Sequence, residues 1–167
     1  MESGKKKKYK NVLFADLDGT LINTIFGKDF PIACYDMAIK WDVLEAIRIC
    51  NPEVVLIVSN QGGIEAGFVN PNFFRNKIMW VSSVVAEYCK CDCSFDYCPT
   101  NDKNNIFRKP NPGMINKFIE QECDVDENFM AIMIGDRDED CKCAENANIK
   151  YFDVNDFVAT FGNTKPV

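Results

Sequence analysis

The stretch Phe14-Ala15-Asp16-Leu17-Asp18-Gly19-Thr20-Leu21 decides the fold. It continues an apolar run at residues 12–15, which is typical of a short buried strand. Asp16 and Asp18 are two residues apart, a spacing that puts both carboxylates on one side of an extended chain. Gly19-Thr20 is typical of a tight turn. Because two carboxylates at the end of a buried strand are costly when unpartnered, the pair indicates a cation site or a nucleophile beside an acid–base partner.

Apolar runs and helical periodicities alternate along the rest of the chain. The patterns predict strands at residues 11–15, 54–58, 94–98, 129–134 and 150–154. They predict helices at residues 40–50, 72–90, 112–122, 137–146 and 156–161, with Asn111 as cap and Pro112 as first residue of the third. Residues 21–39 and 99–109 are predicted to be loops. This alternation predicts an α/β fold, a three-layer, doubly wound parallel sheet of about five strands.

Length and composition predict a single domain. The 167 residues are 47% hydrophobic, enough for one core. We expect residues 1–10 to be a flexible basic tail and residues 11–167 to form the domain. The intervals between Asp16, Ser59 and Lys109 are filled by the sheet's own helices and loops, so we expect no inserted cap domain and an open site.

Charge and residue usage narrow the class of function. The net charge of −6 does not favour binding to duplex nucleic acid, which requires basic surfaces. The lysine run at residues 5–8 is interpreted as part of a solvated tail. No transmembrane stretch or signal peptide is recognisable, so we expect a cytoplasmic protein that does not act at a membrane. The nine cysteines are then expected to be reduced. Because the chain lacks histidine, its acid–base chemistry must come from other residue types.

Three polar signatures follow predicted strands, at residues 16–18, 59–61 and 135–140. Ligand sites of parallel sheets lie beyond the carboxyl ends of the strands. Asp16, Asp18 and Asp136 offer the oxygen ligands that suit Mg²⁺ bound beside a phosphate. Ser59 adds a hydroxyl donor, and Lys109 adds positive charge on a loop constrained by prolines. Together they predict a phosphate site with a metal.

These motifs resemble those of the haloacid dehalogenase (HAD) superfamily of phosphatases, subfamily IIIA. The resemblance implies that Asp16 is the nucleophile, which forms an aspartyl-phosphate, and that Asp18 is the general acid and base. It implies phosphate binding by Ser59, Asn60 and Lys109. It further implies Mg²⁺ binding by Asp16, Asp136 and the backbone carbonyl of Asp18. The implied supporting residues are Thr20 and Asp140, the latter acting on metal-bound waters or on Lys109.

The segments at residues 59–64 and 108–114 resemble histidinol-phosphate and heptose-bisphosphate phosphatases and the 3′-phosphatase of polynucleotide kinases. Residues 18–31 resemble the polynucleotide 3′-phosphatases more closely. Arg108 and Lys28 are additional candidates, for substrate binding. Sugar phosphatases of this branch often carry a zinc loop of three Cys and a His. Because this chain lacks His and its cysteines lack knuckle spacing, we expect no structural zinc. A set of Cys89, Cys91, Cys93 and Cys98 stays open as an alternative.

Three hypotheses about function remain open. The first is a polynucleotide 3′-phosphatase, and the second is a phosphatase of a small sugar, nucleotide or histidinol-type phosphate. The third is a receiver-like or catalytically silent binding module. Receivers place the phosphorylated aspartate after an inner strand downstream of an acidic pair, whereas here the aspartate pair ends the first strand. Oligomeric state is not predicted. The aromatic side chains Trp41, Phe73, Phe74 and Trp80 are interpreted as core or helix-face residues. Asp138 and Glu139 are interpreted as solvated helix residues. Arg137 could contact either the substrate or the neighbouring acids.

Overall fold

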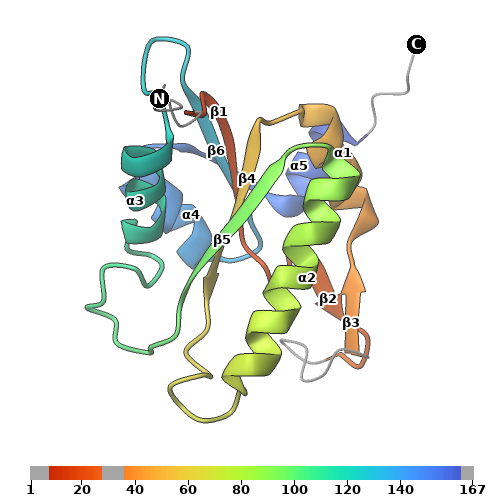
Figure 1. Cartoon of the computed structure of the whole chain (residues 1–167), viewed down its shortest axis with the longest axis vertical. Coiled ribbons are helices and arrows are strands. Elements are labelled where there is room, and N and C mark those ends of the chain that lie inside the picture. The colour runs from red at the N-terminus through yellow and green to blue at the C-terminus, as the bar shows by residue number, and fades with distance from the viewer. Residues whose placement is uncertain (1–7, 28–35, 163–167) are drawn as a thin grey trace, which may run out of the picture.

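A computed structural model describes residues 8–27 and 36–162 of the chain. Five parallel strands form one sheet in the order β5-β4-β1-β6-β7. This confirms the predicted fold class and number of strands, and β1 lies at the centre of the sheet (Figure 1). The strands are β1 (Asn11–Ala15), β4 (Val54–Asn60), β5 (Asp92–Cys98), β6 (Met130–Gly135) and β7 (Lys150–Asp153).

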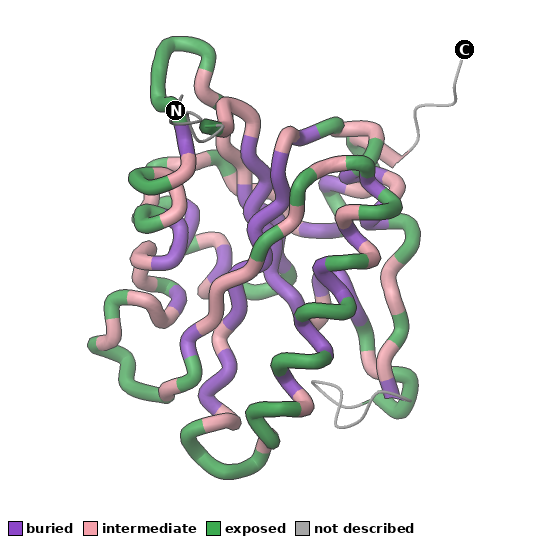
Figure 2. The backbone as a smooth tube through the Cα atoms, in the orientation of Figure 1, coloured by how far each residue is buried: buried purple, intermediate pink, exposed green. Residues whose placement is uncertain are grey.

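Helices cover both faces of this sheet, which makes three layers (Figure 1). One face packs against α1 (Trp41–Cys50), α2 (Pro71–Cys89) and α5 (Val154–Phe161), and the other against α3 (Gly113–Glu122) and α4 (Asp138–Asn146). Side chains of β1 alternate between the two cores, with Leu13 in one and Phe14 in the other. The central strands are therefore the most buried part of the chain (Figure 2).

A small antiparallel pair lies in the segment predicted to be a loop at residues 21–39. β2 (Ile22–Thr24) pairs with β3 (Met37–Ile39), so the prediction of a plain loop was wrong. Strands of three residues are too short to show an alternating pattern. Between β1 and β4, the described residues hold this pair and α1 but no inserted domain.

Two boundaries differ from the predictions in ways that matter for the site. β4 continues through Ser59 and Asn60, because β5 runs beside it as far as the pair Asn60 and Cys98. Asn111 is not a helix cap. Its side-chain amide donates to the backbone carbonyls of Lys103 and Asn105, and α3 begins at Gly113.

Other elements are displaced by one or two residues. α2 starts at Pro71, capped by the Asn70 side chain, and α5 starts at Val154, capped by Asp153. Tyr9 lies in the segment predicted to be a flexible tail, but it forms a β-bridge with Cys123, so the prediction fails at this residue. The two tryptophans lie on helices but face solvent, with exposed fractions of 54% for Trp41 and 47% for Trp80. Phe73 is half-buried and Phe74 is fully buried, as expected of core or helix-face residues.

None of the helices in the described ranges is both long and apolar enough for a membrane span.

Candidate active site

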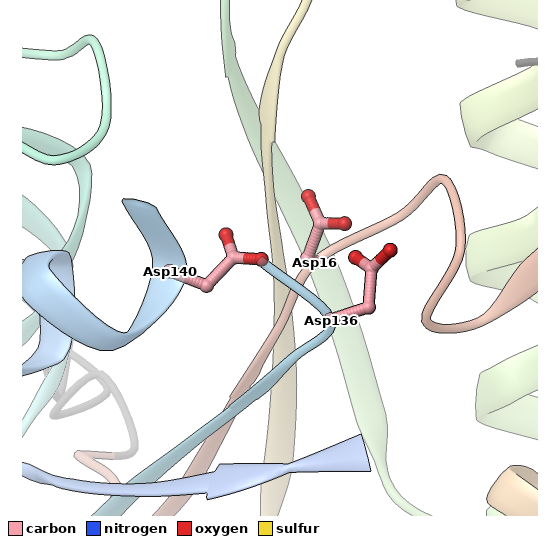
Figure 3. A group of neighbouring side chains, drawn as sticks. All are labelled: Asp16, Asp136 and Asp140. Atoms are coloured by element: carbon pink, nitrogen blue, oxygen red, sulfur yellow. The ribbon is translucent and has the colours of Figure 1, made fainter. Parts of the chain in front are cut away.

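Three carboxylates meet at the carboxyl ends of the central strands. Asp16 follows β1, Asp136 follows β6, and Asp140 lies in the first turn of α4 (Figure 3). One oxygen of each carboxylate lies within 4.8 Å of the others. Neighbouring parallel strands bring together residues that are far apart in the sequence, as the pairing of Ala15 with Ile134 shows.

The Gly19-Thr20 turn fits closely under these acids. Gly19 has a φ of +89°, and a Cβ atom there would lie 2.2 Å from Oδ2 of Asp136. Glycine is therefore required both by the backbone conformation and by the approach of the carboxylate. The Thr20 hydroxyl lies 3.4 Å from Asp16 Oδ2 and 3.3 Å from Asp136 Oδ1, where it can donate to either.

Lys109 is buried between two of the acids. Its Nζ donates to Asp16 Oδ1 and to Asp140 Oδ1, both at 2.6 Å, and to the Val58 carbonyl at 2.9 Å. Burial raises the pKa of both carboxyls, and the Lys109 ammonium opposes that rise. Burial acts to lower the pKa of Lys109, but the two carboxylates outweigh it and raise that pKa. Lys109 therefore stays charged, with all three donors used.

Asn60 fixes the loop that carries Lys109. Its side-chain oxygen accepts from the Lys109 backbone N–H at 2.9 Å, and its side-chain nitrogen donates to the Lys109 carbonyl at 2.9 Å. The Asn60 side chain, predicted to bind phosphate, is thus committed to the backbone of Lys109. Asn60 also lines the pocket described below, so the residue both positions Lys109 and borders the site.

Two residues that were not among the predicted site residues contact Asp18, although Gln61 belongs to the polar signature at residues 59–61. Lys77 Nζ of α2 donates to Asp18 Oδ1 at 3.0 Å, and Gln61 Nε2 donates to Asp18 Oδ2 at 2.8 Å. The same Gln61 nitrogen lies 2.8 Å from Ser59 Oγ, so it links two of the predicted site residues. Lys77 could have been noticed in the sequence, because it is a charged residue on the apolar face of a predicted helix.

These residues border a pocket of about 230 Å³. Asp16, Asp18, Ser59 and Lys109 line it together with the turn that follows β4. Arg108 also lines it, while one of its guanidinium nitrogens donates to the Thr100 carbonyl at 2.8 Å. Arg137 and Glu139 line it too and form an ion pair at 3.9 Å. Glu139 is half-buried and therefore less solvated than predicted, whereas Asp138 is exposed as predicted. Lys28 lies outside the described residues.

The acid cluster has the composition of a magnesium site. Asp16, Asp18, Asp136 and Asp140 carry four negative charges when ionised, and Lys77 and Lys109 return two positive ones. The excess of two charges matches one divalent cation, and oxygen donors are the ligands that Mg²⁺ takes. Since both Asp140 oxygens already accept, from Lys109 and from the Arg137 N–H, Asp16 and Asp136 are the direct ligands that fit best.

The cysteines form no comparable group among the described residues. The eight described cysteines are free thiols. Cys98 ends β5, whereas Cys91 precedes that strand and Cys93 lies near its start. Cys91 and Cys93 therefore lie near one end of β5 and Cys98 at the other, so the four cysteines considered as a zinc site do not all lie at one end of this strand.

Comparison with known proteins extends these observations. A family model described as "Polynucleotide kinase 3 phosphatase" matches residues 11–158. The chain belongs to this family. The polynucleotide kinase 3 phosphatase model spans every strand of the five-stranded sheet, and the chain has a HAD-like phosphatase fold.

Proteins similar to this chain include phosphatases that are named for small substrates. The D-glycero-alpha-D-manno-heptose-1,7-bisphosphate 7-phosphatase of Burkholderia mallei is 31% identical over 147 residues, which cover 82% of this chain and 75% of that protein. The histidine biosynthesis bifunctional protein HisB of Xanthomonas campestris (strain B100) is 33% identical over 153 residues. That match covers 84% of this chain but 38% of HisB, so the chain spans well under half of that bifunctional protein.

A solved structure shares the fold. The D,D-heptose 1.7-bisphosphate phosphatase from B. bronchiseptica, complexed with magnesium and phosphate, superimposes with a TM-score of 0.71. It is 20% identical to this chain, and the match covers 93% of this chain and 88% of that one.

Proposed function

We propose that this chain is a Mg²⁺-dependent phosphomonoesterase that works through an aspartyl-phosphate, and that its substrate is the 3′-phosphate of a polynucleotide. The observation that carries the chemistry is Asp16, a buried carboxylate that Lys109 holds at 2.6 Å and that lines a polar pocket. The description of the matching family model supports the polynucleotide substrate. So does the absence of an inserted cap among the described residues, which leaves the pocket accessible to a chain end.

The residues divide the reaction between them. An Asp16 oxygen attacks phosphorus and forms a P–O bond, while the bond to the leaving oxygen breaks and Asp18 donates a proton to that oxygen. Asp18 then takes a proton from water as the water oxygen attacks phosphorus, which releases inorganic phosphate and restores Asp16. Ser59 and Lys109 stabilise charge on the phosphoryl oxygens. Asp16, Asp136 and the Asp18 carbonyl would hold Mg²⁺, which would supply the positive charge that lets a phosphate dianion approach an acidic site.

A second candidate is a phosphatase of a small sugar phosphate. Two observations favour it, namely the names of the relatives and the net charge of −6, which does not attract a polyanion. The two candidates share every step of the chemistry and differ in what surrounds the phosphate.

A panel of substrates decides between them. We expect Mg²⁺-dependent phosphate release from a 3′-phosphorylated oligonucleotide, with kcat/KM at least about tenfold above that for heptose, nucleotide and histidinol phosphates, because each stacked base adds ~1–3 kcal/mol. Excess EDTA should abolish release, and added Mg²⁺ should restore it. The small-substrate proposal replaces the first if one sugar phosphate is preferred. Equal, weak rates on the whole panel contradict both.

Phe68 offers a stacking surface beside the pocket. Its side chain is 85% exposed, and its backbone N–H donates to the carbonyl of Gly63, a lining residue. We expect Phe68→Ala to lower kcat/KM for the oligonucleotide by roughly tenfold through loss of base stacking, with phenyl phosphate unaffected. Val125→Ala, at an exposed apolar residue outside the pocket lining, is the matched control. An unchanged rate on the oligonucleotide would show that Phe68 takes no part in recognition.

A further inference from the structure

Both oxygens of the Asp18 carboxylate are held by side chains from other elements. Lys77 donates to one oxygen at 3.0 Å and Gln61 donates to the other at 2.8 Å. These two donors approach opposite oxygens, so together they fix the rotation of the carboxylate about its Cβ–Cγ bond. With Gln61 alone, that rotation would be restrained at one oxygen only.

Lys77 occupies a position at which an apolar residue would be expected. It is 5% exposed, and it lies on the face of α2 that buries Phe74, Ile78 and Val81. Its Nζ lies 5.4 Å from the centre of the Phe74 ring. Burying an ammonium group there is costly, and replacing a buried ion pair by apolar side chains is often neutral or stabilising. Fold stability alone therefore does not account for a lysine at this position.

The ion pair joins Lys77 to a residue with a role in the reaction. The side-chain exposures of Lys77 and Asp18 are 3% and 13%, so the lysine is closed off while the carboxylate keeps a face toward the pocket. Lys109, the other buried lysine in the described part of the chain, is fully engaged with Asp16, Asp140 and the Val58 carbonyl. Among the described residues, Lys77 is thus the cation that orients Asp18.

We propose that Lys77 is a positioning residue, which holds the Asp18 carboxyl at the angle needed to pass its proton to the leaving oxygen. This inference rests on the proposed function and deepens it. It predicts an effect that depends on the leaving group, because an alkoxide or phenoxide needs the proton whereas a nitrophenoxide leaves without it. A residue that only supported the fold would affect all esters alike.

The test compares Lys77→Met with wild type on nitrophenyl phosphate, phenyl phosphate and glycerol phosphate, with Mg²⁺ present. Since general acid catalysis contributes about 10²–10⁴-fold, we expect kcat/KM to fall on the order of 10²-fold for glycerol phosphate and less than about threefold for nitrophenyl phosphate. The effect should be on kcat, with KM nearly unchanged. Arg75→Met removes an exposed positive charge from the same helix and is the matched control.

A double-mutant cycle separates the two roles that Lys77 can play. If Lys77 acts through Asp18, adding Lys77→Met to Asp18→Asn should cause no further loss on glycerol phosphate. Thermal unfolding of each variant shows whether it is folded, and Lys77→Gln replaces Lys77→Met if the latter is not. Equal losses across the three esters, or additive losses in the cycle, overturn this inference while leaving the proposed function intact. Inactivity of wild type on every ester overturns both.

Discussion

Replacing Asp16 with asparagine is expected to abolish phosphate release from every ester. The amide keeps the shape of the side chain but cannot form the covalent P–O bond, and loss of a nucleophile in other hydrolases costs up to about 10⁶ in kcat. We expect a loss of at least about 10³-fold on both nitrophenyl phosphate and a 3′-phosphorylated oligonucleotide. Rates measured in excess Mg²⁺ check this result.

The matched control for this variant is Asp138→Asn. Asp138 is an exposed carboxylate in the first turn of α4, two residues from Asp136, and it does not line the pocket. Its replacement makes the same chemical change near the site and should leave kcat within about twofold of wild type, as expected of a surface position. Activity that survived in Asp16→Asn at the level of this control would remove Asp16 from the role of nucleophile.

Replacing Lys109 with methionine is expected to cost both activity and stability. The substitution leaves Asp16 and Asp140 buried without their shared cation, and breaking a buried pair in this way costs about 3–5 kcal/mol. For a domain of this size the melting temperature should fall by roughly 6–20 °C, measured without divalent ions. Lys103→Met, at an exposed lysine of the same loop, should change it by less than about 2 °C.

The stability deficit of Lys109→Met should depend on pH. Burial already raises the pKa of both carboxyls, and the variant loses the ammonium that opposes this rise. The folded variant therefore binds more protons than the unfolded chain, so its free energy of unfolding increases as pH falls. We expect the deficit to be smaller at pH 5 than at pH 8. A deficit that is constant over this range would mean that the two carboxyls are not the cause.

The sequence predicted most of the sheet and the strand-end residues for a clear physical reason. A parallel strand buried on both faces is a continuous apolar run, and the polar residue that ends it stands out. Asp16, Ser59 and Asp136 were located in this way, and the sheet order then brought them together. The β2–β3 pair was missed because strands of three residues carry no periodic signal.

Contacts made by side chains from other elements were not predictable in the same way. Gln61 follows a strand end, but nothing in the sequence says that its amide spans Ser59 and Asp18. Lys77 lies three residues after Phe74 and four before Val81, so helical spacing placed a charge on the buried face. A charged residue on the buried face of a helix indicates a functional contact. The partner of Lys77, Asp18, is visible only in the three-dimensional structure.

Asn60 anchors both ends of one loop. Its backbone is in register with Cys98, where the chain leaves β5, and its side chain binds the backbone of Lys109, where the loop ends. The first residues of this loop are also held by the turn after β4, because Asn101 donates to the Gly62 carbonyl at 3.0 Å and Glu65 accepts from Thr100 and Asn101. Doubling the length of such a loop costs only about 0.6 kcal/mol in closure entropy. An insertion in the exposed stretch at residues 102–104 would therefore cost little, while Asn60 keeps Lys109 in place.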